Sequence, residues 1–361
     1  MLSNSLGGTK KKGRASLSNK EGRYEPLVHV EEDDGWYRER ETTAVATKLL
    51  VDTTKSVITY NVSPDVPFDR SINPYRGCEH GCIYCFARPT HTFLGFSAGL
   101  DFETKILYKP KASQLLKAEL ANRHYSCAPI ALGVNTDAYQ PAEEQLKLTR
   151  QVLELLRSCK HPVSIVTKSS LIVRDVDLLS EMAKDKLVNV YISLTTLNSR
   201  LKKILEPRAA APAKRLKTVE RLASAGVPVG VMVAPVIPAI NDSEIEEILD
   251  TASRCGAESA GYVLLRLPNE LPKLFEEWLE CHFPERRKHV LNLVSSTRGG
   301  NLYDSSYGRR MRGTGAYARM IARRFEIASR RSGLFEKRNY LRSDLFTRPA
   351  LDGQMELFSY G

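Results

Sequence analysis

Along the middle of the chain, short runs of apolar residues alternate with longer segments in which apolar and polar positions are mixed. A short apolar run is typical of a buried strand, and apolar positions recurring every three to four residues are typical of a helix. We expect strands at residues 128–134, 163–167, 188–194, 227–236 and 261–267, and helices at residues 142–159, 176–184, 213–225 and 243–255. Gly226 lies where a helix C-terminus favours glycine, and Asp242 or Ser243 is the expected cap of the last helix.

Regular alternation of apolar strands with helices indicates an α/β fold built on a parallel sheet. Five or six such repeats predict a barrel or a partial barrel, and barrel enzymes place their chemistry at the carboxyl ends of the strands. Polar residues follow the predicted strands at residues 135–141, 167–170, 193–196 and 241–242. Because these strand ends meet at one edge of the sheet, we expect a functional site there.

The segment before the first of these strands contains three closely spaced cysteines in a C-x3-C-x2-C pattern: Cys78, Cys82 and Cys85. Three such thiolates can hold three irons of a [4Fe–4S] cluster and leave the fourth iron free to bind a substrate or cofactor. A zinc site is an alternative, with His80 or His91 as the fourth ligand, although the chain has no second C-x2-C pair. The other four cysteines are scattered, and we expect most of them to be small core residues.

Basic residues exceed acidic residues by 53 to 42 in this chain of 361 residues, which gives a net charge of +11 and favours a polyanionic partner. We expect residues 1–25 to be a disordered basic tail. Residues 315–331 have the spacing of an amphipathic helix. Its apolar face would pack on the core, and its other face would present arginines to nucleic-acid phosphates: Arg319, Arg323 and Arg330. A merely solvated face is the alternative.

The chain has neither the apolar leader of a signal peptide nor an apolar run near the roughly 18 residues of a membrane span. We therefore expect no membrane association and a cytoplasmic location, where thiols stay reduced and serve metals or catalysis.

The chain resembles the radical S-adenosylmethionine (radical SAM) superfamily and, within it, the DNA repair photolyase-like branch related to spore photoproduct lyase. The cysteine pattern with Tyr84 before its last cysteine matches the superfamily, and further segments match the branch: residues 71–85, 87–91, 135–141, 206–208 and 234–238. The resemblance implies a partial (β/α)6 barrel, a [4Fe–4S] cluster, SAM, and an electron donor such as flavodoxin or ferredoxin. It also implies cleavage of SAM to methionine and a 5′-deoxyadenosyl radical, chemistry that the cofactor itself supplies.

The same resemblance implies roles for individual residues around SAM. Thr136 and Asp137 suit the methionyl ammonium group, and Lys168 suits the carboxylate. The remaining expected cofactor residues are Ser193 and Thr195 for the ribose, Glu206 and Arg208 for ribose or carboxylate, strand residues Val233 and Pro235 for adenine, and Tyr84 and Asn135 beside them.

One position departs from the branch. Spore photoproduct lyase uses a cysteine near the end of the first of these strands as a hydrogen-atom donor, and this sequence has Asn135 there. Cys127, at the start of the same strand, would lie at the wrong end of a barrel. The resemblance therefore does not extend to that repair route, and we expect a tyrosine such as Tyr139 as donor or a different reaction.

The last residues contain a Q-x-x-L-F pattern, formed by Gln354, Leu357 and Phe358. It resembles the peptide with which bacterial repair and replication proteins dock on the sliding clamp. Leu357 and Phe358 would fill an apolar pocket, and Gln354 would hydrogen-bond at its rim. The alternative is that this pair simply packs on the domain.

These observations predict a basic tail at 1–25, an N-terminal extension at 26–65, a partial barrel at 66–290, a basic helical region at 291–348 and a flexible tail at 349–361. The expected function is that of a radical SAM enzyme acting on nucleic acid, with DNA favoured. The alternatives are an RNA, protein or small-molecule substrate, or a non-catalytic, metal-stabilised nucleic-acid-binding protein.

Overall fold

The computed structural model describes residues 11–25, 45–335 and 340–350. Its main sheet has seven strands in the order β10-β9-β8-β7-β6-β3-β2. The strands are β2 (Ile58–Tyr60), β3 (Arg70–Ile72), β6 (Ile130–Leu132), β7 (Val163–Thr167), β8 (Val188–Ser193), β9 (Val229–Val236) and β10 (Ser259–Leu264). All neighbours are parallel except β2, which runs antiparallel to β3. Six parallel strands in an open sheet confirm the predicted partial (β/α)6 barrel.

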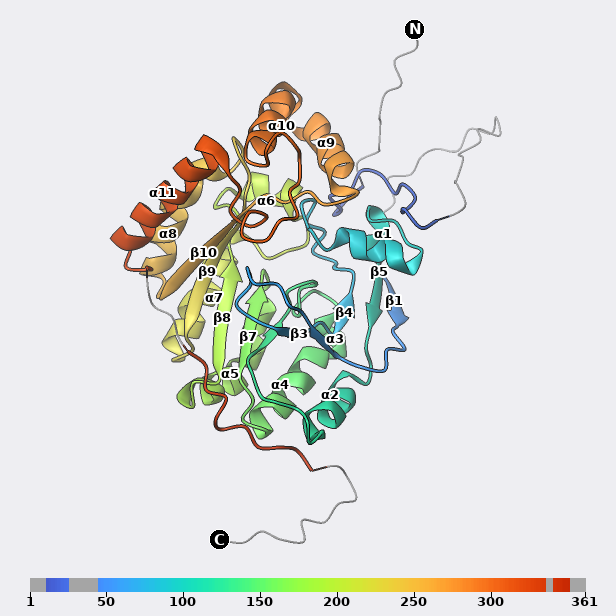
Figure 1. The fold of residues 1–361 in the computed structure, drawn as a ribbon, viewed down its shortest axis with the longest axis vertical. Coiled ribbons are helices and arrows are strands. Elements are labelled where there is room, and N and C mark those ends of the chain that lie inside the picture. The colour runs from blue at the N-terminus through green and yellow to red at the C-terminus, as the bar shows by residue number, and fades with distance from the viewer. Residues whose placement is uncertain (1–10, 26–44, 336–339, 351–361) are drawn as a thin grey trace.

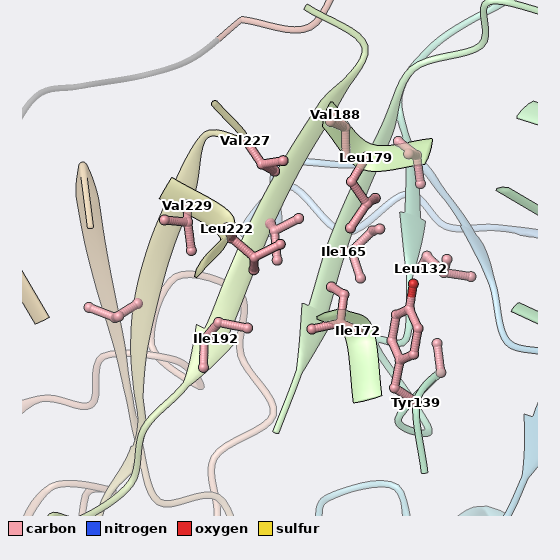
Figure 2. Packing of buried hydrophobic residues seen from close by; sticks show 14 of the residues in the cluster. Leu132, Tyr139, Ile165, Ile172, Leu179, Val188, Ile192, Leu222, Val227 and Val229 are labelled. Atoms are coloured by element: carbon pink, nitrogen blue, oxygen red, sulfur yellow. The ribbon is translucent and has the colours of Figure 1, made fainter. Parts of the chain in front are cut away.

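Helices cover the outer face of this curved sheet (Figure 1). They are α2 (Ala112–Ala121), α4 (Leu148–Ser158), α5 (Val176–Lys184), α7 (Pro212–Ser224) and α8 (Ile245–Arg254). Leu179 and Leu222 from the helices pack against Leu132, Ile165 and Val229 from the strands (Figure 2). Full burial of these side chains removes apolar surface from water, which is the dominant favourable term in folding.

Several predicted boundaries need correction. The helix expected at residues 142–159 is two helices, α3 (Glu143–Leu146) and α4, because Lys147 has a positive φ of 51°. The Glu143 carboxylate accepts from the Thr149 amide at 3.0 Å and so satisfies a free donor at the start of α4. The expected cap of α8 was wrong, since no side chain caps it and Asp242 instead accepts from the Tyr317 hydroxyl. Gly226, with φ of 74°, confirms the predicted end of α7.

The N-terminal residues that the structure describes pack on the domain, so the prediction of a disordered tail was wrong for residues 11–25. Arg14, Ser16 and Leu17 are buried, and Arg14 donates to the Glu103 carbonyl at 2.6 Å. The chain continues into a second sheet, in the order β1-β5-β4, formed by β1 (Lys48–Val51), β4 (Tyr75–Arg76) and β5 (Lys105–Tyr108). Short elements complete the domain near it: η1 (Arg88–Leu94) and α1 (Leu100–Thr104).

The C-terminal part begins after β10 with α9 (Leu271–His282), η4 (Pro284–Arg286) and α10 (Arg287–Ser296). The helix predicted at residues 315–331 is α11 (Gly315–Arg331), which packs on α8 and β10 through Ile321, Phe325 and Ala328. None of the described helices combines the length and apolar character needed to cross a bilayer. Gln354, Leu357 and Phe358 lie outside the described residues, so clamp docking stays a prediction.

Candidate active site

A cavity of about 300 Å³ opens at the carboxyl ends of the parallel strands. Polar strand ends and the cysteine loop meet there, as the alternation of strands and helices predicts. Nine of the predicted site residues line this one cavity: Cys78, Cys82, Tyr84, Cys85, Asn135, Asp137, Lys168, Ser193 and Pro235.

The cysteine loop lies between β4 and η1 and is held by a buried arginine. Arg88 donates to the carbonyls of Cys82 at 2.8 Å and Gly81 at 3.2 Å, and its guanidinium lies 2.5 Å from the Glu103 carboxylate. Both side chains of this ion pair are fully buried. Gly81 has a φ of 66°, and a Cβ there would lie 2.7 Å from Glu103. The backbone that presents the cysteines is therefore fixed by contacts from outside the loop.

The three cysteines fit an iron–sulfur cluster in burial and in chemistry. All three are free thiols on the cavity wall. Burial raises the pKa of each, that of Cys82 to about 12, so positively charged iron is needed to stabilise the thiolates that bind it. Within the described ranges, no three His, Cys, Asp or Glu side chains are arranged to hold a single metal ion. Cluster thiolates do not converge on one ion, because each binds a different iron.

The two histidines considered as zinc ligands have other partners. His80 lines the cavity with Nδ1 3.2 Å from the Asp137 carboxylate. His91 is buried beneath Phe102, and its Nε2 lies 2.9 Å from the Lys105 carbonyl. His91 is not part of the cavity wall.

Asp137 presents a buried carboxylate to the cavity. It accepts from the Thr167 hydroxyl at 2.6 Å and from the Lys168 amide at 2.7 Å. Burial alone would raise its pKa, but His80 and these hydrogen bonds outweigh burial and lower the pKa to about 2. An anionic oxygen on the wall suits an ammonium group.

Lys168 follows β7 and extends along the cavity wall. Its Nζ donates to the Ser193 hydroxyl at 2.5 Å and to the Ala234 carbonyl at 3.3 Å. Nζ also lies 3.4 Å from Glu206 and over the Tyr84 ring. These contacts hold a positive charge next to the cysteine loop.

Glu206 lies behind the cavity wall and contacts the wall residues Tyr84 and Lys168. Its carboxylate accepts from Tyr84, from Thr195 at 2.7 Å, and from Arg215, and all four side chains are buried. Burial opposes ionisation, but Arg215 and Lys168 hold the pKa of Glu206 well below its usual range. Arg215 is a residue that the sequence analysis missed. Its one sequence signal is its place on the apolar face of α7, three residues after Pro212 and four before Val219.

Some predicted cofactor residues do not reach the cavity. Glu206 and Thr195 lie behind the wall, and Thr136 is buried with its hydroxyl donating to the Tyr75 carbonyl. Arg208 does not line the cavity, and its guanidinium lies 3.1 Å from the Glu79 carboxylate. Val233 points into the core between wall residues 232 and 234. This geometry therefore does not support direct contact with the cofactor for five predicted residues: Thr136, Thr195, Glu206, Arg208 and Val233.

Tyr139 is also outside the cavity wall. It is fully buried in the hydrophobic core near Leu132 and Ile172 (Figure 2). This placement contradicts the expected role as hydrogen donor, because the hydroxyl has no access to the cavity. Cys127 packs against the core and does not line the cavity either, as its position at the start of the strand suggests.

Comparison with known families agrees with this geometry. The model of the radical SAM superfamily matches residues 72–252, half of the chain. The chain belongs to this superfamily, whose enzymes use a [4Fe–4S] cluster and SAM.

Among curated proteins, an uncharacterised protein of Mycobacterium tuberculosis is 36% identical over 222 residues, 61% of this chain and 65% of that protein. The chain thus spans about two thirds of the length of that relative. An uncharacterised protein of Methanocaldococcus jannaschii is 27% identical over 228 residues, 63% of this chain and 81% of that protein.

Among solved structures, spore photoproduct lyase complexed with dinucleoside spore photoproduct superposes with a TM-score of 0.54 at 18% identity, over 80% of each chain. A mutant of the same enzyme with bound AdoMet and the dinucleoside gives a TM-score of 0.51 at 17% identity, over 81% of this chain and 82% of that one. These similarities show a shared fold.

Proposed function

We propose that this protein is a radical SAM enzyme that acts on nucleic acid, with DNA as the favoured substrate. The observation that carries the proposal is the cavity in which three free cysteines, an anionic Asp137 and a cationic Lys168 meet at the carboxyl ends of parallel strands. When bound, the cluster and SAM supply the reducing electron and the radical. The chain's own residues bind, orient and shield these groups.

The wall residues divide between the two ends of an amino acid. Lys168 provides a positive charge for the carboxylate of SAM, and Asp137 provides a negative charge for its ammonium group. Ser193 fixes the ammonium group of Lys168 through a 2.5 Å hydrogen bond. Glu206, which is paired with Arg215, lies 3.4 Å from the same ammonium group behind the cavity wall. Wall residues Met232, Ala234 and Pro235 on β9 offer an apolar surface for the adenine.

Changing Lys168 to Met should weaken SAM binding by roughly 10- to 100-fold, because one hydrogen bond to a charged group is lost. Glu206 keeps Arg215 as its partner, so the fold should persist. Equilibrium dialysis with SAM measures the effect, and Lys184→Met, an exposed lysine on α5, is the matched control. Equal SAM affinity in both variants would remove Lys168 from the binding site.

Two observations support nucleic acid as substrate. The chain carries a net charge of +11, and the similar fold of spore photoproduct lyase binds a dinucleoside lesion in one solved structure. A base held in duplex DNA would have to leave the stack to reach the cavity.

We expect an ultraviolet-irradiated thymine-rich oligonucleotide to be altered by the reduced protein and SAM, and the intact oligonucleotide to be unchanged. If neither oligonucleotide is altered, ultraviolet-damaged thymine-rich DNA is rejected as the substrate. A small redox protein such as flavodoxin or ferredoxin is the proposed electron donor.

Replacing Arg319, Arg323 and Arg330 on α11 by Ala should weaken nucleic-acid binding. All three are exposed, although Arg323 and Arg330 share Glu326 as a partner at 3.2 and 3.3 Å. Loss of phosphate contacts should lower the salt dependence of binding, by about 0.9 in slope for each contact to a duplex. Ala variants of three exposed arginines elsewhere serve as a control: Arg200, Arg221 and Arg286. If both triple variants lose the same affinity, α11 has no specific role.

A further inference from the structure

Arg266, just beyond the end of β10, lines the cavity without a carboxylate partner among the described residues. Within the described part of the chain, its Nη1 has only the weak acceptor Met311 Sδ, at 3.4 Å. Its Nε is buried and has no hydrogen-bond partner there. A buried donor without an acceptor is costly, so this guanidinium has unused capacity to bind a ligand.

A second arginine adds positive charge behind Arg266. Arg298 is buried and donates to the carbonyls of Leu265 at 2.8 Å and Arg309 at 2.8 Å, and no carboxylate of residues 11–25, 45–335 or 340–350 contacts it. Burial and then the charge of Arg266 lower the pKa of Arg298. The nearby Asp304 lies 3.5 Å from Arg309 instead. Two neighbouring guanidinium groups that no described carboxylate contacts favour an anion at this wall.

An aromatic ring lies against the same guanidinium. Phe86, the residue after Cys85, lines the cavity, and its ring centre is 5.0 Å from the guanidinium carbon of Arg266. The ring orients the arginine through a cation–π contact, and it is 41% exposed. Guanidinium groups bind phosphate through paired hydrogen bonds, and exposed aromatic rings stack on nucleobases.

Arg266 and the lysine assigned to the SAM carboxylate follow different strands of the sheet. Lys168 follows β7, and its Nζ contacts Ser193 on β8 and the Ala234 carbonyl on β9, whereas Arg266 follows β10. We propose that Arg266 binds a phosphate group of the substrate while Phe86 stacks on an adjacent base, so that the substrate enters the cavity as a nucleotide with its phosphate attached. This inference rests on the proposed function.

The test compares binding of a fluorescein-labelled single-stranded oligothymidylate to the reconstituted full-length protein across a NaCl series. Arg266→Gln should bind about tenfold more weakly than the wild type, and its slope of log K against log salt should be smaller by about 0.7, one phosphate contact on a single strand. Arg266→Lys should keep the slope because it keeps the charge. Arg254→Gln, an exposed arginine at the end of α8, removes the same charge elsewhere and should match the wild type.

The outcomes separate this inference from the function on which it rests. If the wild type binds the oligonucleotide and Arg266→Gln matches Arg254→Gln in affinity and slope, the phosphate site is wrong and the proposed function stands. If Arg266→Gln weakens SAM binding in dialysis but leaves oligonucleotide binding unchanged, the anion is the SAM carboxylate and the inference is overturned. If the wild type does not bind the oligonucleotide, single-stranded DNA is rejected as the substrate and this inference falls with it.

Discussion

Changing Cys82 to Ala should abolish SAM cleavage. Cys82 is one of three thiols on the cavity wall, and a cluster with one open iron cannot lose another ligand and remain intact. Loss of a partner that only supports a metal ligand already costs 10- to 100-fold, so loss of a ligand should reduce 5′-deoxyadenosine formation by more than about 100-fold. Iron content after anaerobic reconstitution and chromatography of the SAM products measure the effect.

Cys255→Ala is the matched control, because Cys255 follows α8 on the outside of the barrel and is absent from the cavity wall. This variant should keep the iron content and the cleavage activity of the wild type. Undiminished cleavage in Cys82→Ala would show that the cluster is not held by this loop.

Changing Arg88 to Met should both destabilise the protein and empty the cluster site. The change leaves the Glu103 carboxylate without its arginine in a fully buried position, which costs about 3–5 kcal/mol in the free energy of unfolding. It also frees the carbonyls of Gly81 and Cys82, so the loop that presents the cysteines loses its fixed shape. Denaturant unfolding and iron content are the two measurements.

The control for Arg88 is Arg157→Met. Arg157 pairs with Glu181 at 2.6 Å on the surface, and breaking an exposed pair costs at most about 1 kcal/mol. The double variant Arg88→Met with Glu103→Leu should recover part of the stability, since it removes the stranded charge, but not the iron content. If Arg88→Met unfolds like Arg157→Met and binds iron normally, the buried pair does not support the loop.

The predicted residues that line the cavity are those whose position depends on local pattern. The cysteine spacing brings three thiols onto one loop, and Asp137 and Lys168 meet because parallel strands end at one edge of the sheet. The helix at residues 315–331 was predicted with its bounds because its apolar spacing is regular over 17 residues.

The contacts that were missed depend on how separate elements pack against one another. Arg88 pairs with Glu103 through the packing of η1 on α1, and Arg215 reaches Glu206 only once α7 has docked on the sheet. The strand β3 was missed because it has three residues, one of them a buried arginine, and no apolar run. Tyr139 was assigned to the site because it follows a strand, but a turn directs its ring back into the core.

The three cysteines are expected to hold a cluster that cleaves SAM. The most direct test is to reconstitute the protein anaerobically with iron and sulfide, reduce it with dithionite, add SAM and measure 5′-deoxyadenosine together with metal content. About four irons and four sulfides per chain, with 5′-deoxyadenosine formed only in the reduced sample, is the result expected here. One zinc per chain, no sulfide and intact SAM would overturn the cluster assignment and leave a metal-stabilised binding protein.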